Sequence, residues 1–207
     1  MWLKIVIGML TGYLLGNLNG AVSISTLMKD DVRSHGSGNA GLTNFIRNYG
    51  NTKALYVVAV DAVKAVLSCL ILGYLLAEEN MFLEGVMLGG VAVMLGHVFP
   101  VLLGFRGGKG ILSGLFIAFV ADWRIALLIA VIFFTVYFLT RYVSLSSLLA
   151  ATAFGIGFLI FRFGNWVVVG CGLFMAALTI FMHRSNIARL LAGKEVKTDL
   201  FKKEKSV

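Results

Sequence analysis

Charged residues are scarce in this sequence, and their scarcity excludes a soluble domain. Aspartate, glutamate, lysine and arginine make up 14% of its 207 residues, whereas soluble domains carry about 25%. The hydrophobic fraction is 59% and the mean hydropathy is +0.91. We therefore predict a single integral-membrane domain over residues 1–207. The formal net charge of +8 does not by itself indicate nucleic-acid binding, and no nucleic-acid partner is expected.

Cysteine and histidine are also rare. Cys69 and Cys171 both fall inside apolar runs, so we interpret them as small core residues and infer no disulfide. The three histidines, His35, His97 and His183, are far apart in the sequence. This separation argues against a metal site, and none is expected.

The apolar segments predict an all-α polytopic membrane protein with seven transmembrane helices, because each span needs about 20 residues. The expected spans are 2–28, 54–77, 85–103, 111–121, 125–139, 145–161 and 166–182. The fourth covers only about half a bilayer, so it is expected to be a tilted span or a re-entrant half-helix, and one or more spans are short or broken.

The first apolar run has two features of its own. It has no basic region beyond Lys4 and no small-residue cleavage site, so we interpret it as a retained span rather than a signal peptide. Glycines recur in it every four residues, at Gly8, Gly12, Gly16 and Gly20. This stripe favours close packing of another helix, with a groove for an acyl chain as the alternative.

The basic residues predict the orientation in the membrane. Lys4, Arg124 and Arg162 fall on one side of the seven-span arrangement. The other side holds Lys29, Arg33, Arg47, Lys53, Arg106, Lys109, Arg141, Arg184, Arg189, Lys194, Lys197, Lys202, Lys203 and Lys205. Because cytoplasmic loops carry the excess of lysine and arginine, the N-terminus is expected outside and the C-terminus in the cytoplasm. The loops 29–53, 104–110 and 183–195 then share the cytoplasmic face and suggest one composite site.

The first of these loops has the composition of a phosphate-binding site. Its glycines, in the stretch 36–41, leave backbone N–H groups uncovered, and Arg47 supplies a planar cation. Neutral hydrogen-bonding groups come from Ser37, Asn39, Thr43 and Asn44. If residues 42–49 form a short helix, its N-terminal amides and Arg47 can point at one anion. The stretch also fits the dinucleotide-binding pattern of glycines, but apolar spans flank it, so we discard that interpretation.

The other two loops contain related chemistry. Residues 104–110 place glycines around Arg106 and Lys109. His183 and Asn186 lie three residues apart, and therefore on one face if this segment is helical.

Inside the second span, Asp61 and Lys64 have the same spacing and can neutralise each other. We interpret them as a structural ion pair, with bracing of the first loop as the alternative.

Three motifs, taken together, resemble the acyl-phosphate-dependent glycerol-3-phosphate acyltransferases of bacteria, the PlsY family. They are Gly36-Ser37-Gly38-Asn39 with Gly41, Thr43, Asn44 and Arg47; Gly96-His97-Val98-Phe99-Pro100 with Phe105-Arg106-Gly107-Gly108-Lys109-Gly110; and His183-Arg184 with Asn186, Arg189, Gly193 and Glu195. The likeness covers nearly the whole chain in order. Leu42, Arg106 and Ile111-Leu112-Ser113 depart from the usual family pattern.

The resemblance implies a reaction in which an acyl group moves from acyl phosphate to a hydroxyl of glycerol-3-phosphate, giving lysophosphatidic acid and phosphate. It also implies a seven-span protein of the bacterial cell membrane, with membrane lipid around it, a cytoplasmic-facing site and no metal or cofactor. Acyl-chain preference and oligomeric state are not predicted.

The chemistry of such a site assigns roles to individual residues, because it must hold two phosphates and stabilise a tetrahedral oxyanion. Arg47 and Lys109 are expected to clamp phosphate. The candidate catalytic residues are Ser37, Arg47, Lys109, His183 and Asn186. The candidate substrate-binding residues are Gly38, Asn39, Thr43, Asn44, His97, Gly107, Gly108, Ser147 and Arg184.

Two questions stay open at this point. The base is either His183, whose ordinary pKa is about 6.5, or a phosphate of the substrate, and we favour the phosphate, with His183 in a positioning role. The alternative function is a membrane transporter or channel for a small anionic solute. The polar groups cluster at one face and no internal repeat is visible, which favours the enzyme.

Overall fold

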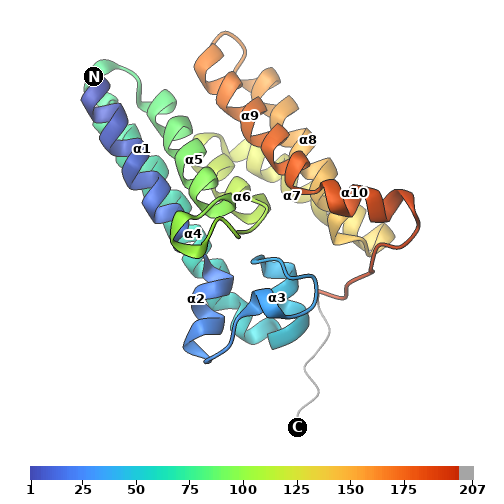
Figure 1. Cartoon of the computed structure of the whole chain (residues 1–207). Helices are drawn as coiled ribbons and strands as arrows, with labels where there is room; N and C mark the ends of the chain where they lie inside the picture. The colour runs from blue at the N-terminus through green and yellow to red at the C-terminus, as the bar shows by residue number, and fades with distance from the viewer. Residues whose placement is uncertain (201–207) are drawn as a thin grey trace.

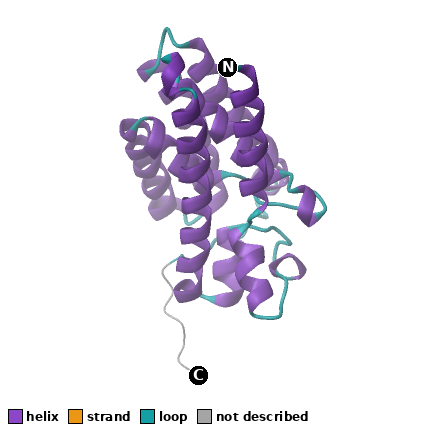
Figure 2. Ribbon diagram, turned by 90° about the vertical axis from the view of Figure 1, so that its left-hand side faces the viewer, coloured by secondary structure: helices purple, strands orange, loops and turns teal. Residues whose placement is uncertain are grey.

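The computed structural model describes residues 1–200, and every regular element within them is helical (Figure 2). The α-helices are α1 (Trp2–Asn17), α2 (Gly20–Leu27), α3 (Leu42–Tyr49), α4 (Asn51–Leu75), α5 (Phe82–Val98), α6 (Ile111–Ala121), α7 (Trp123–Thr140), α8 (Val143–Phe161), α9 (Trp166–Met182) and α10 (Arg184–Leu191), with short 3-10 turns η1 (Val32–Ser34), η2 (Ala77–Glu79) and η3 (Val101–Leu103). The tail lysines Lys202, Lys203 and Lys205, expected on the cytoplasmic side, lie outside the described residues.

Two groups of long helices are joined through a short one (Figure 1). Helices α1, α4 and α5 pack together, and α7, α8 and α9 pack in sequence. Helix α6 contacts α4, α5 and α7, and α5 also reaches α9. The apolar core follows these contacts and contains residues from α4 to α9, among them Met94, Ile117, Ile125 and Phe158.

By length and hydropathy, the described residues contain four membrane spans, or six if each bent pair of helices is counted as one span, and the seven spans expected are not confirmed. Helices α4, α7, α8 and the segment Phe82–Leu103 can each cross a membrane alone. The pairs α1–α2 and α9–α10 qualify only when each pair is counted as one span, bent by 44° and 55° respectively. Helix α6 occupies the predicted 111–121, but its 11 residues rise only about 16 Å, well short of a hydrocarbon core of about 30 Å.

The span expected over 2–28 consists of two helices, with a break between Asn17 and Gly20. A buried ion pair supplies the hydrogen-bond partners that the backbone loses at the break. The Lys64 ammonium donates to the carbonyl of Leu18 at 2.8 Å, and the Asp61 carboxylate accepts from the N–H of Gly20 at 3.2 Å. The two side chains lie 2.7 Å apart and are almost fully buried. Since unpaired backbone groups are costly in an apolar setting, this pair holds the break in place. The expected ion pair is therefore confirmed.

The glycine stripe of α1 serves helix packing. At Gly16 a Cβ atom would lie 2.4 Å from the carbonyl oxygen of Val93 and 2.7 Å from the Cα of Gly96, so α1 and α5 approach backbone to backbone. Gly8 faces the Leu72 side chain of α4, and Gly12 faces the side chains of Ser68 on α4 and Ala92 on α5. The packing interpretation is confirmed, and none of these glycines lines the cavity described below.

The first loop folds into a small lobe below the bundle, made of α2, η1, α3 and the start of α4 (Figure 1). Its own apolar core contains Val32, Phe45 and Val57, each fully buried. Helix α3 forms at the predicted 42–49. The lobe therefore gives the glycine-rich stretch 36–41 a rigid support.

The remaining loops gather at two opposite ends of the molecule. At the end of the N-terminus, Lys4 pairs with Glu78 at 2.8 Å, and Asn165 donates to Glu84 at 2.8 Å. The loops 29–53, 104–110 and 183–195 lie at the other end, where residues from all three surround one cavity. Both cysteines are free thiols, as predicted.

Candidate active site

A cavity of about 730 Å³ lies between the two helix groups and the lower lobe. One end of it is apolar. The other end is polar and is lined by Ser37, Asn39, Thr43, Asn44, Arg47, Lys109, Ser144, Ser147, His183, Asn186, Arg189 and Glu195. All five candidate catalytic residues are thus brought together from loops far apart in the sequence.

In the first loop, the Asn44 side chain shapes the backbone. Its amide nitrogen donates to the carbonyls of Val32, His35 and Asn39 at 2.9, 3.0 and 3.1 Å. Its amide oxygen accepts from the N–H of Ser37 at 3.0 Å. These hydrogen bonds give Asn44 a role in holding the loop, and its expected contact with substrate stays a prediction. Ser37 and Thr43 line the cavity beside it.

Gly36 shows why this loop needs glycine. Its φ of +56° is in the left-handed region, and a Cβ atom there would lie 2.4 Å from the amide oxygen of Asn44. Gly38 has a φ of +69° and is not among the described residues that line the cavity, so its expected contact with substrate stays a prediction.

The second loop is anchored on His97. The N–H of Gly108 donates to the carbonyl of His97 at 3.0 Å, and a Cβ atom on Gly108 would lie 2.1 Å from the Nε2 of His97. On its other side the ring accepts at Nδ1 from the Lys64 ammonium at 2.8 Å. His97 borders the cavity, but this arrangement makes it a support for the loop that carries Lys109. Gly107 and Gly108 pack against His97 and are not among the described residues that line the cavity, so their expected contact with substrate stays a prediction.

Lys109 begins a chain of polar contacts across the site. Its ammonium donates to the amide oxygen of Asn186, whose amide nitrogen donates to Glu195 at 2.8 Å. Glu195 accepts in turn from Arg189 at 2.7 Å. Burial and the nearby guanidinium of Arg189 lower the pKa of Lys109 to about 8. Burial alone would raise the pKa of Glu195, but its hydrogen bonds to Asn186 and Arg189 outweigh this and lower it.

His183 follows the last residue of α9 and is buried. Its Nδ1 lies 2.8 Å from the carbonyl of Thr179. Because a carbonyl only accepts, Nδ1 carries the proton and Nε2 is left as an acceptor. Burial lowers the pKa of His183 to about 4, and the hydrogen bond to Thr179 offsets only part of this effect. The ring is therefore neutral near pH 7 and can accept a hydrogen bond in the cavity.

Arg47 lies on α3 and is held by the C-terminal segment. Its Nε donates to the hydroxyl of Thr198 at 2.9 Å, and its Nη2 donates to the same hydroxyl and to the carbonyl of Val196 at 3.4 Å. The hydroxyl of Tyr137 fixes this segment by donating to the carbonyl of Thr198 at 3.2 Å and accepting from the N–H of Leu200 at 2.8 Å. The segment thus closes one side of the cavity and orients the guanidinium.

Two other predicted residues have different locations. Ser147 lines the cavity from α8. Arg184 is exposed: its guanidinium lies 4.6 Å from the ring centroid of Phe181 and donates to the carbonyl of that residue at 3.3 Å. Arg184 is not among the described residues that line the cavity, so the expectation that it binds substrate there is not supported.

The sequence did not assign roles to three residues that the fold brings to the site. Arg189 and Glu195 belong to the third motif, whose spacing was the available signal. Thr198 follows in the lysine-rich tail, where no pattern distinguished it.

Comparisons with known proteins agree on one family. A model of the glycerol-3-phosphate acyltransferase family matches residues 6–193. Among curated proteins named glycerol-3-phosphate acyltransferase, that of Thermoanaerobacter pseudethanolicus is 40% identical over 193 residues, covering 93% of this chain and 94% of the relative. The one from Finegoldia magna is 34% identical over 197 residues, covering 95% and 97%.

Two solved structures are similar along nearly the whole chain. Both are crystal structures of PlsY (YgiH), described as an integral membrane glycerol 3-phosphate acyltransferase. The glycerol 3-phosphate form has a TM-score of 0.85 and 31% identity, covering 96% of this chain and 99% of that one. The lysophosphatidic acid form has a TM-score of 0.81 and 31% identity, covering 95% and 96%.

Proposed function

Because this chain belongs to the glycerol-3-phosphate acyltransferase (PlsY) family of integral membrane enzymes, we propose that it takes the acyl group from acyl phosphate and forms lysophosphatidic acid and inorganic phosphate. The observation that carries this proposal is the cavity, which has a cationic, hydrogen-bonding end and an apolar end. Acyl phosphate has the same two parts, an anionic head and a hydrocarbon chain, so its chemistry matches both ends.

The reaction forms one bond to the acyl carbonyl carbon and breaks another. The hydroxyl oxygen of glycerol-3-phosphate attacks the acyl carbonyl carbon, and the bond from that carbon to the phosphate oxygen breaks. The hydroxyl proton leaves with the phosphate, which is the base in this scheme. A ring with a pKa of about 4 is a poor proton acceptor near pH 7, which supports a positioning role for His183.

The cations and donors of the site have separate roles in this scheme. Arg47 and Lys109 bind the two phosphates, since each presents a cation at the cavity that can form charge-assisted hydrogen bonds with phosphate. Ser37 and Thr43 orient the donor phosphate or the oxyanion. The Nε2 of His183 positions glycerol-3-phosphate, and Ser147 adds a phosphate contact. Asn186 acts through Lys109, because its amide oxygen accepts from the Lys109 ammonium while its amide nitrogen donates to Glu195.

We also propose that the protein lies in the bacterial cell membrane, with α1 and α4 to α9 as its seven spans and α6 crossing only in part. The polar end of the cavity faces the cytoplasm and the N-terminus lies outside. The clustering of loops 29–53, 104–110 and 183–195 at one end of the molecule supports this orientation, because these loops carry most of the cations.

The function is tested by phosphate release from synthetic acyl phosphate in detergent. We expect release that depends on glycerol-3-phosphate and yields lysophosphatidic acid in equal amount. Glycerol in place of glycerol-3-phosphate is the control, because it offers hydroxyls without the anion that the site binds. No release, together with solute flux in liposomes, would replace the enzyme by the transporter alternative.

The lowered pKa of Lys109 predicts that the activity falls at alkaline pH. An ammonium with a pKa of about 8 is charged below that pH and loses its proton as the pH rises through it. We therefore expect kcat/KM for acyl phosphate to fall above about pH 8, because kcat/KM reports the free enzyme. Initial rates of phosphate release between about pH 6 and about pH 10 measure this.

Lys109→Arg is the matched variant for this limit. Arginine stays charged across the range, so the alkaline fall should move upward by more than about one pH unit, even if the absolute rate is lower. An alkaline limb that stays in place in Lys109→Arg would assign it to another group.

A further inference from the structure

We infer that Phe154 and Met175 close the deep end of the cavity and set the longest acyl chain that the enzyme transfers. The inference rests on the proposed function, which places the acyl chain along the apolar wall. It adds a determinant of chain length, on two helices that carry no part of the three motifs.

The wall beyond the polar end is apolar on every helix that contributes to it. Past Ser147 on α8 and Thr179 on α9, all the lining side chains are hydrophobic. The apolar wall consists of Met94, Leu112, Leu115, Ile129, Ala130, Phe133, Phe134, Ala150, Ala151, Phe154, Met175 and Ala176. Such a wall binds a hydrocarbon chain by excluding water from it.

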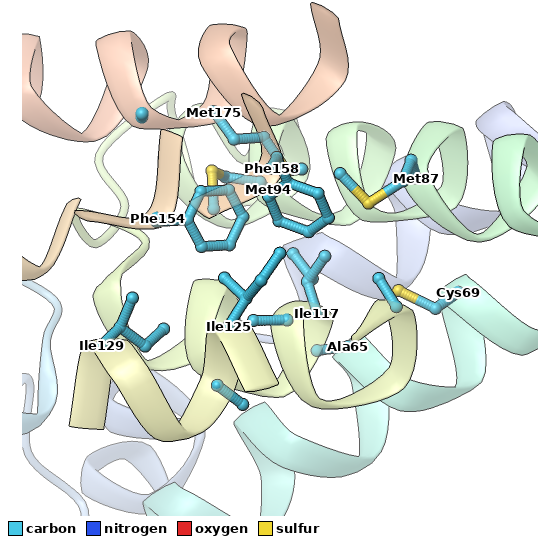
Figure 3. Close-up of a cluster of buried hydrophobic side chains, with 14 of the residues drawn as sticks. Ala65, Cys69, Met87, Met94, Ile117, Ile125, Ile129, Phe154, Phe158 and Met175 are labelled. Atoms are coloured by element: carbon cyan, nitrogen blue, oxygen red, sulfur yellow. The ribbon is translucent and has the colours of Figure 1, made fainter. Parts of the chain in front are cut away.

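On four helices the wall ends in residues that are almost fully buried. Its last residues are Met94 on α5, Ile129 on α7, Phe154 on α8 and Met175 on α9, which are between 0% and 6% exposed. Figure 3 shows Phe154, Met94 and Met175 as neighbours in the packed core, with Phe158 directly beside them. These side chains are therefore the meeting point of the cavity and the core.

Behind this layer the core is filled. The next residues on three helices, Ile117, Ile125 and Phe158, are fully buried and do not line the cavity. The ring centroids of Phe154 and Phe158 are 4.9 Å apart. A Cβ atom added at Gly172 on α9 would lie 2.8 Å from the Cβ of Phe158. No route for a longer chain continues in that direction, because the interior is close-packed.

The length of the cavity along α8 sets the length of acyl chain that it can hold. From Ser144 to Phe154 the helix rises about 15 Å. Each methylene that enters the cavity should improve kcat/KM about fourfold, the equivalent of about 0.8 kcal/mol. Once the chain reaches Phe154 and Met175, the next methylene gains nothing or must displace a packed side chain.

The experiment measures kcat/KM for acyl phosphates of increasing length, from decanoyl to stearoyl. In the wild type, kcat/KM should rise with chain length up to a certain length and then level off or fall. We call the length at which this change occurs the break. Phe154→Ala and Met175→Ala should move the break towards longer chains by about two or more methylenes, because each removes the side chain that ends the cavity. Ala151→Leu, which adds bulk to the wall before Phe154, should move it towards shorter chains.

A buried control separates chain length from loss of stability. Leu72 is fully buried on α4 and lies outside the cavity, so Leu72→Ala should leave the position of the break unchanged. If Phe154→Ala does not fold, Phe154→Leu and Ala151→Leu provide the test, because they change volume less. Thermal unfolding in detergent shows which variants are folded.

The outcomes are distinguishable. An unchanged break in folded variants of Phe154, Met175 and Ala151 would overturn the inference while leaving the acyltransferase intact. That result would indicate that the acyl chain leaves the cavity sideways past Phe134, which lines the wall but is 44% exposed. Absence of phosphate release at every chain length would refute the proposed function and this inference with it.

Discussion

Replacing Arg47 by alanine is expected to lower kcat/KM for acyl phosphate by about 10²–10³-fold. The structure holds this guanidinium at the cavity through the Thr198 hydroxyl and the Val196 carbonyl. A cation oriented before substrate arrives needs no rearrangement when charge develops, which is why its loss is costly. The measurement is the initial rate of phosphate release at limiting acyl phosphate.

Two comparison variants show whether charge or geometry matters at Arg47. Arg47→Lys keeps the charge but loses the planar fork, so it should recover only part of the activity. Arg184→Ala removes a neighbouring cation that contacts only Phe181 and Met182 among the interactions seen, and it should change the rate by less than about threefold. Equal losses in Arg47→Ala and Arg184→Ala would mean that net charge, and not the site, explains the effect.

His183→Ala is expected to reduce kcat by about 10²-fold or more, whereas His183→Gln should stay within about tenfold of the wild type. The reason is the tautomer: Nδ1 donates to Thr179, so Nε2 presents an acceptor to the cavity. A glutamine side chain offers an acceptor oxygen and fills similar space, while alanine offers neither. Steady-state rates with saturating substrates measure the difference.

The pH profile of these variants separates positioning from proton transfer. With a pKa of about 4, His183 is neutral above that pH and becomes protonated as the pH falls through it, so its acceptor is lost only in acid. Had His183 been the base, His183→Gln would be as inactive as His183→Ala. The positioning role instead predicts an active glutamine variant that lacks the acid limb near pH 4, because glutamine presents an acceptor that does not titrate.

Most helices could be predicted from the sequence because hydropathy and helix periodicity are local properties. Residues 42–49, 111–121 and 166–182 form helices with the predicted bounds. The break after Asn17 could not be predicted in this way. It depends on Asp61 and Lys64, which supply the missing hydrogen bonds from more than 40 residues away.

The role of each polar residue within the site depended on contacts that no local pattern contains. Asn44 and His97 have the composition of ligand-binding residues, yet their polar atoms hold backbone and a buried lysine. Arg184 belongs to a motif but lies outside the cavity wall. A side chain's chemistry allows a role, and only the neighbours that saturate its hydrogen bonds decide whether it remains available.

The sequence by itself determined that this is a helical membrane protein whose glycine-rich, cationic loops are suited to phosphate, because composition and spacing along the chain contain that information. The tertiary structure decided which of those loops meet and how deep their shared cavity runs. Arg47 and Thr198 are 151 residues apart and become neighbours only when the lower lobe and the C-terminal segment pack on the same bundle. Long-range packing of this kind is set by the whole apolar core at once.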